Sequence, residues 1–235
     1  MKRTVRSVAA LLAIVLISGC TVTQQLDYHS AKERTASFDF EVEDFFVAVL
    51  EDFSDFSPAE GDEDLMDKAI RDFERALQRS PATSGVSLDK VDENSWYGYF
   101  TVHDLERLIV DLGAGANQTL LTLTDDSLSF FLSMDNYDQL VPVIPFLADP
   151  NFEAFGPVYN QGLSEEDYLE MISFMLGEEG VPAIEESTIT LTLRTPRPVK
   201  SFTAGTKRSA DLYEFSFPLI DFLLLADPIT FTVRW

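Results

Sequence analysis

The chain has a single cysteine, Cys20, at the end of an apolar run near the N-terminus. The run from Val8 to Ile17 is wholly apolar, but ten helical residues rise only about 15 Å at 1.5 Å each, half the thickness of a bilayer core. The run is therefore too short for a stable transmembrane helix. Because there is no second cysteine, no disulfide can stabilise the body, and its 19 phenylalanines must supply much of a hydrophobic core.

The segment before Cys20 has the layout of an export signal. Basic residues at Lys2, Arg3 and Arg6 precede the apolar run, and small residues follow it. This order of basic, apolar and small residues is typical of a secretory signal peptide. We predict that residues 1–19 are removed from the mature protein.

The four residues Ile17-Ser18-Gly19-Cys20 resemble the lipobox of bacterial lipoproteins. The resemblance implies that the thiol of Cys20 receives a diacylglycerol, that cleavage follows Gly19, and that the new amine is acylated. Thr21 stands where an inner-membrane retention signal of this class carries Asp, so in a diderm host the resemblance favours the outer membrane. The alternative is an ordinary signal peptide with a chance cysteine.

Acylation of this kind would determine where the protein resides. One fatty chain binds a membrane only marginally, whereas two or three chains, at about 0.8 kcal/mol per buried CH₂, anchor a protein stably. We therefore predict a lipid-anchored protein of the cell envelope, which binds the membrane through the covalent lipid on Cys20.

The mature chain is strongly acidic. Removal of residues 1–19 takes away three of the 17 basic residues and none of the 40 acidic ones, which leaves a formal charge of −26. Such a surface is repelled by nucleic acid and by anionic headgroups, so we predict no nucleic-acid partner. Solubility, including adaptation to a saline habitat, is the favoured explanation of the acidity. A cation-binding surface or a basic partner is the alternative.

The pattern along the chain predicts three parts: a signal peptide over 1–19, an acylated cysteine with a polar tether over 20–35, and a single acidic domain over 36–235. Residues 21–35 are polar without a sustained period, which favours a tether. The hydrophobic pattern of the remainder alternates between periods of 2 and 3.6, and several strands occur in adjacent pairs. We expect an α+β fold, with a mainly antiparallel β-sheet and several packed α-helices in a single domain.

The individual elements follow from the same patterns. Strands are expected at 37–44, 85–91, 95–102, 118–125, 127–134, 187–195, 199–206, 211–217 and 229–235, and helices at 57–81, 103–113, 136–150 and 163–177. The pattern of 45–53 fits a helix or a buried strand, with a helix favoured, and 218–227 fits a short turn or helix. Asp104 is expected near the start of one helix, and Ser164 with Asp167 resembles a capping box at the start of another.

The residues that usually carry catalysis are scarce. His29 falls in the expected tether and His103 at a strand-to-helix junction, and the sequence has no GxSxG motif for a serine nucleophile. A structural role for His103 is favoured. Zinc lacks its usual ligands, because the one thiol is acylated. We predict no catalytic residues, no cofactor and no metal site.

Two alternatives rest on carboxylates. The segments 60–67 and 124–138 are rich in oxygen ligands for calcium, but neither matches the EF-hand spacing, and a helix start and turns explain them. Paired carboxylates can also hydrolyse glycosides, but no pair stands out among 40 acids.

Three functions are compatible with the sequence. The favoured one is a non-catalytic envelope lipoprotein that binds an envelope protein or has a structural role. The second is a carrier or sensor of a hydrophobic ligand such as a lipid, with the apolar segments 140–157 and 218–227 around a cavity. The third is an acid-only hydrolase. An aromatic group at 96–100 suits sugar stacking or core packing, with alternate members on opposite faces of a strand.

Overall fold

The residues directly after Cys20 form a strand in the middle of the largest sheet. The computed structural model describes residues 21–30, 33–41, 65–148, 153–178 and 180–235. Its first strand, β1 (Thr21–Ser30), pairs antiparallel with β2 (Glu33–Glu41) and parallel with β7 (Thr188–Arg194). The prediction of a polar tether over 20–35 is therefore wrong for all of β1 and for the first three residues of β2.

The tether prediction failed because polar residues obscure the period of β1. Leu26 and Tyr28 face the core, as an alternation with period two predicts. Two residues before Leu26, on the same side of the strand, the polar Gln24 interrupts the apolar pattern. A central strand bordered on both sides draws its stability from backbone pairing as well as from apolar side chains. The signal of β1 in the sequence is accordingly weak.

The main sheet has the order β3-β4-β2-β1-β7-β10-β9 in the described part of the chain. Its remaining strands are β3 (Thr83–Asp92), β4 (Ser95–Val102), β9 (Thr206–Lys207) and β10 (Leu212–Pro218). Every neighbouring pair is antiparallel except β1 with β7. The parallel pair follows from the position of β1, which the sequence did not reveal.

A smaller antiparallel sheet has the order β5-β6-β11-β8 within the described residues. Its strands are β5 (Leu121–Leu123), β6 (Ser127–Leu132), β11 (Ile229–Arg234) and β8 (Ser201–Phe202). Aromatic rings join the two sheets: the ring of Phe231 lies 5.0 Å from that of Phe215 and 5.4 Å from that of Tyr213. These contacts bury large apolar surfaces between the layers.

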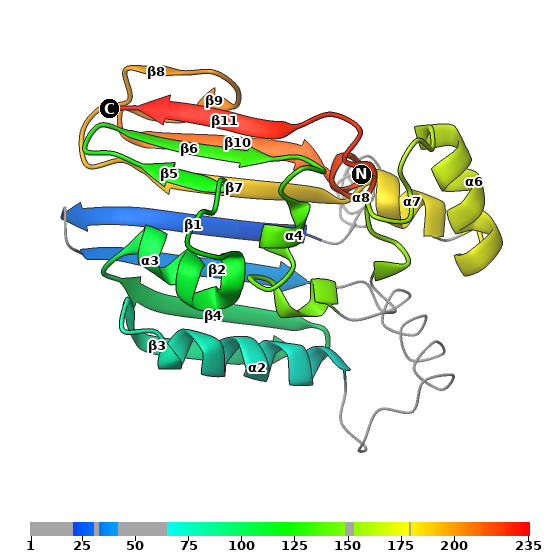
Figure 1. Cartoon of the computed structure of the whole chain (residues 1–235), viewed down its shortest axis with the longest axis horizontal. Helices are drawn as coiled ribbons and strands as arrows, with labels where there is room; N and C mark the ends of the chain where they lie inside the picture. Colours follow the sequence, from blue (N-terminus) through cyan, green and yellow to red (C-terminus); the bar gives the residue numbers. More distant parts are fainter. Residues whose placement is uncertain (1–20, 31–32, 42–64, 149–152, 179) are drawn as a thin grey trace, which may run out of the picture.

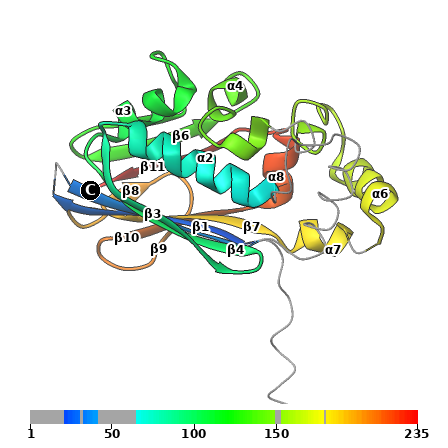
Figure 2. The same ribbon diagram turned by 90° about the horizontal axis from the view of Figure 1, so that it is seen from below.

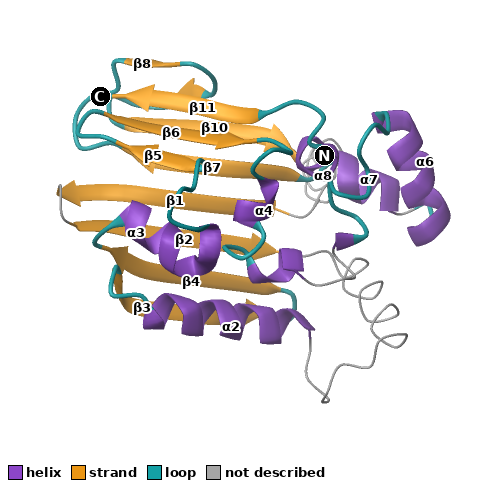
Figure 3. Cartoon of the chain, in the orientation of Figure 1, coloured by secondary structure: helices purple, strands orange, loops and turns teal. Residues whose placement is uncertain are grey.

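The described helices lie between and beyond these strands. They are α2 (Leu65–Arg79), α3 (Leu105–Ile109) with the π turn η1 (Val110–Ala114), α4 (Tyr137–Leu140), the 3₁₀ turn η2 (Pro145–Ala148), α6 (Glu165–Leu176), α7 (Gly180–Glu185) and α8 (Leu219–Leu224). The expected helix at 45–53 lies outside the described residues. The α+β prediction, with mainly antiparallel pairing, is confirmed (Figure 3).

The helices and the smaller sheet cover one face of the main sheet. Figures 1 and 2 show α2, α3 and α4 on the same side as β5, β6 and β11, with no described element across the opposite face. On the covered side, Phe73 of α2 lies 6.0 Å from the ring of Phe38, and Leu77 is fully buried. The hydrophobic core therefore lies on one side of the sheet.

The predicted helix caps are present. The side chain of Asp104 accepts a hydrogen bond from the backbone N–H of Arg107 at 2.9 Å, and Ser164 Oγ accepts one from the backbone N–H of Asp167 at 3.1 Å. Each satisfies a donor that the first turn would otherwise leave unpaired. Gly113, with φ of 116°, ends the turn after α3 in a conformation that disfavours other residues.

Three helices form a separate cluster at one end of the main sheet, which we call the helical cap: α6, α7 and α8. Its buried side chains are Phe155, Tyr168, Ile172, Leu176, Ile184 and Ile220. Burial raises the pKa of the Tyr168 hydroxyl, which donates a hydrogen bond to the backbone oxygen of Phe155 at 3.1 Å. No helix in the described ranges has the length and apolar character needed to cross a membrane.

Candidate functional site: the anchor end and the open sheet face

The start of β1 lies at one end of the main sheet, where the strand ends form a row. Thr21 pairs with Glu41 on β2 and with Thr188 on β7, and Thr188 pairs with Pro218 on β10. The predicted lipid attachment residue Cys20 and the cleavage residue Gly19 lie outside the described residues. Cys20 directly precedes Thr21 in the sequence. An anchor on Cys20 would therefore be held against this end.

The face of the main sheet turned away from the helices is rich in hydroxyl groups, and we call it the open face. Its hydroxyl-bearing residues include Thr23, Thr35, Ser37, Thr101, Thr190, Thr192 and Ser216. One of these hydroxyl pairs, Thr190 Oγ1 with Ser216 Oγ, lies at 2.9 Å across two strands. The alternation of the strands puts apolar residues on the covered side and these residues on the open side.

Two tyrosines of β4 stand on the open face. Tyr97 and Tyr99 are 44% and 43% exposed, while Trp96 before them and Phe100 after them are buried on the covered side. The strand thus divides the aromatic group predicted from the sequence into a buried half and an exposed half. Exposed tyrosines on a flat sheet present ring faces and a hydroxyl group to a partner.

Carboxylates flank the first of these tyrosines. Tyr97 pairs with Asp39 on β2 and with Asp89 on β3, and both acids are exposed. The carboxylate of Asp89 accepts a hydrogen bond from Ser87 Oγ at 2.7 Å. The exposed ring of Tyr97 therefore has a carboxylate on each neighbouring strand.

The position of β4 is fixed from behind by close packing. An ideal Cβ atom on Gly98 would lie 2.0 Å from Cε1 of Phe38, so only glycine leaves room for that ring. The buried indole of Trp96 donates a hydrogen bond from Nε1 to Asp67 at 3.1 Å and carries Lys90 over its ring at 5.2 Å. The exposed tyrosines thus lie on a strand whose covered side is closely packed.

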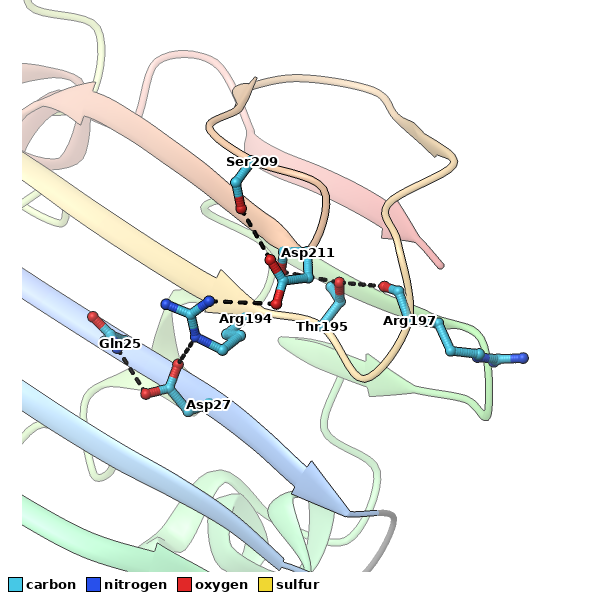
Figure 4. A network of polar contacts seen from close by, with 7 residues as sticks. All are labelled: Gln25, Asp27, Arg194, Thr195, Arg197, Ser209 and Asp211. Carbon is cyan, nitrogen blue, oxygen red and sulfur yellow. Dashed lines mark hydrogen bonds and ion pairs between the residues drawn. The ribbon is translucent and has the colours of Figure 1, made fainter.

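A polar network occupies the other end of the open face (Figure 4). Arg194 lies between two carboxylates, with Nε 3.3 Å from Asp27 Oδ1 and Nη1 3.4 Å from Asp211 Oδ2. Ser209 Oγ donates a hydrogen bond to Asp211 at 2.9 Å, and this bond, with the contact from Arg194, lowers the pKa of Asp211. The network ties β1, β7 and the start of β10 together, which is a structural role.

His103 lies where β4 leads into α3. Its Nε2 is 2.8 Å from Ser84 Oγ, and its backbone oxygen accepts a hydrogen bond from Arg34 at 3.4 Å. Among the described residues no carboxylate is hydrogen-bonded to the other ring nitrogen, as a catalytic triad would need. His29 is in β1 rather than in a tether.

A depression beside α3 has a volume of about 390 Å³ and is open to solvent and mainly polar. Its charged groups already have partners. Glu106 accepts a hydrogen bond from the backbone of Leu123 at 3.1 Å, and Arg107 forms an ion pair with Asp111 at 2.7 Å. These contacts join α3 to β5 and stabilise the helix.

The remaining predicted segments have structural roles where they are described. Of the two acidic segments, 60–67 lies mostly outside the described residues, and in 124–138 the carboxylate of Asp126 accepts a hydrogen bond from Thr124 within a turn. Within the described residues no group of three or more His, Cys, Asp or Glu side chains could hold a metal ion. Described apolar residues of 140–157 and 218–227 are packed in the core: Leu140, Val143, Leu147, Phe155, Ile220 and Leu225.

Comparisons with known proteins add little. No family model matches the chain, and no curated protein matches it. The NMR structure of the folded domain of the Mycobacterium tuberculosis LppM protein aligns over 92% of this chain and 88% of that one, with 10% identity and a TM-score of 0.38. A similarity at this level does not establish a shared fold, so the function must be argued from the residues of this chain.

Proposed function

We propose that the protein is a lipid-anchored, non-catalytic lipoprotein of the bacterial cell envelope, and that its open face binds a partner protein. The observation that carries the proposal is the open face, which no described element covers and on which Tyr97 and Tyr99 are exposed, although β4 is closely packed on its other side. The lipobox-like segment ending at Cys20 supports the anchor.

The chemistry of the open face suits a protein surface. Tyrosine is enriched in protein interfaces and among the residues that contribute most to binding, because it buries a large rigid area at a low entropic cost. Asp39 and Asp89, on either side of Tyr97, would favour a partner with basic groups opposite them. A partner is therefore expected to combine an apolar or aromatic centre with lysine or arginine at its rim.

The polar groups that the structure brings together have partners within the fold, and we propose no catalytic role for them. Arg194 is engaged by two carboxylates, Arg107 by Asp111, and Ser84 by His103. Each contact connects secondary structure elements. In a diderm host, Thr21 after the cysteine favours anchoring in the outer membrane.

A double substitution tests the open face. Tyr97→Ala combined with Tyr99→Ala removes both exposed rings, and Phe131→Ala, at an exposed aromatic of β6 in the smaller sheet, is the matched control. After cross-linking in intact membranes, the wild type and the control are expected to retain a shared cross-linked protein that the double variant loses. Circular dichroism confirms that both variants are folded. Equal cross-linking of that protein by the folded double variant would refute the proposal.

A further inference from the structure

The helical cap lies at the same end of the molecule as the start of β1. α7 ends at Glu185, just before β7 begins at Thr188, and α8 follows directly after Pro218 of β10. Thr188 and Pro218 lie in the same row of the sheet as Thr21. In Figures 1 and 2, α6 is the described element farthest beyond this end of the sheet.

Phe174 lies on the outward side of α6 and is almost fully exposed. Tyr168, Ile172 and Leu176 form the buried side of the helix, which packs in the cluster with α7 and α8. Phe174 follows Ile172 by two residues, or about 200° around the helix, and so points away from the body. Its side chain is 92% exposed.

Other exposed apolar residues lie at the end of α6 and in the turn before it. Met175 is the neighbour of Phe174 at the end of α6, and Val158 and Tyr159 lie in the turn before that helix, with Tyr159 67% exposed. Phe174 and Met175 are adjacent exposed apolar side chains at the end of α6, and such a pair marks a candidate interaction surface.

We propose that the helical cap rests on the lipid bilayer, with the ring of Phe174 inserted among the headgroups. This inference rests on the proposed lipid anchor at Cys20. The proposed anchor indicates what the cap contacts. The chain leaves β1 towards Cys20 at the end of the sheet beyond which the cap projects. Acyl chains on Cys20 that enter the bilayer would therefore bring the cap to the membrane surface. Insertion then becomes an intramolecular step, and a small apolar patch suffices for it.

The charge of the cap restricts the type of membrane. Residues 153–187 include no lysine or arginine, and acidic residues crowd the first turn of α6 at Glu165, Glu166 and Asp167. Phe174 lies nine residues beyond Glu165, or about 13 Å along the helix axis. Glu170 lies one turn before Phe174 and Glu178 follows the end of the helix. The surface that the cap suits is therefore zwitterionic, because anionic headgroups repel these acids.

Tryptophan fluorescence of the acylated full chain tests this contact. The native Trp96 and Trp235 are 2% and 1% exposed, so they give a constant background. Phe174→Trp places a reporter on the cap, and Phe202→Trp on β8 is the matched control, a 42% exposed position at the opposite end of the sheet. Each variant is reconstituted into phosphatidylcholine vesicles whose acyl chains carry bromine, a quencher of indole emission.

The expected result is a blue shift and strong bromine quenching for Phe174→Trp, weaker quenching when anionic phosphatidylglycerol is added, and no quenching for Phe202→Trp. Mass spectrometry of the reconstituted protein separates the two claims. An unacylated chain would contradict the proposed anchor. An acylated chain in which Phe174→Trp is quenched no more than Phe202→Trp would overturn the membrane contact alone.

Discussion

Thr21 lies directly opposite Thr188, where β1 and β7 run parallel in the middle of the main sheet. The residue after Cys20 therefore already belongs to the folded body. No linker would separate a lipid on Cys20 from the folded body. The row of residues that includes Thr21 would therefore stay near the membrane surface.

Removal of residues 1–30 is expected to abolish folding. Without β1, the pairing partners of β2 and β7 are lost in the centre of the sheet, and two new edges are exposed. Urea unfolding followed by circular dichroism should show no cooperative transition. A matched truncation that removes residues 1–20 should unfold cooperatively. If both truncations unfold alike, β1 is not the central strand.

The substitution Gly98→Ala is expected to destabilise the protein by about 1–3 kcal/mol, the usual cost of overpacking a core. The added methyl group would collide with the ring of Phe38, which is itself packed on Phe73. The free energy of unfolding from urea titration measures the effect. Thr101→Ala, on the open side of the same strand, should change it by less than about 0.5 kcal/mol. A Gly98→Ala variant as stable as Thr101→Ala would contradict the packing described.

The pKa of Asp221 in α8 is raised by burial, and also by the nearby Glu165 and Asp227. Since the folded state holds this proton more tightly than the unfolded state, ionisation of Asp221 costs stability once the pH exceeds its folded pKa. Asp221→Asn should therefore be more stable than the wild type at pH 7. The advantage should shrink as the pH falls towards the ordinary value of 3.8. Thermal unfolding at both pH values tests this, and an advantage independent of pH would contradict it.

The network around Arg194 makes a prediction about Asp211. Its pKa is lowered first by the hydrogen bond from Ser209 and to a smaller extent by Arg194. Titration followed by NMR should show the Asp211 pKa rising in Ser209→Ala and in Arg194→Met, with the larger rise in Ser209→Ala. Arg194→Met should lower the stability only modestly, because partly exposed ion pairs contribute little. A larger rise in Arg194→Met would reverse the order of the two contacts.

Where the hydrophobic period is clear, the fold could be predicted from the sequence. Ile189, Leu191 and Leu193 alternate with polar residues and face the covered side of β7, and the caps at Asp104 and Ser164 are present. β1 could not be predicted, because its polar composition and Gln24 hide its period. Its parallel pairing joins residues far apart in the chain, which no local pattern reveals.

The candidate surfaces were only partly accessible to the same reasoning. The alternation in β4 correctly indicated that Tyr97 and Tyr99 lie on the side opposite Trp96, but their exposure depends on the absence of a covering element from the described structure. Phe174 falls within the predicted helix at 163–177. Its angular offset from Ile172 is a signal in the sequence, but the position of α6 at the end of the sheet where β1 starts follows only from the register of β1 with β7.

The most direct measurement is the intact mass of the N-terminal peptide of the protein isolated from membranes. The account predicts a mature chain that begins at Cys20, with a mass increased by a diacylglyceryl group and, where the amine is acylated, by a further fatty acid. Cys20→Ser should abolish both this increase and the membrane fractionation. A mature N-terminus at another residue, or an unmodified Cys20 in membrane-bound protein, would contradict the account.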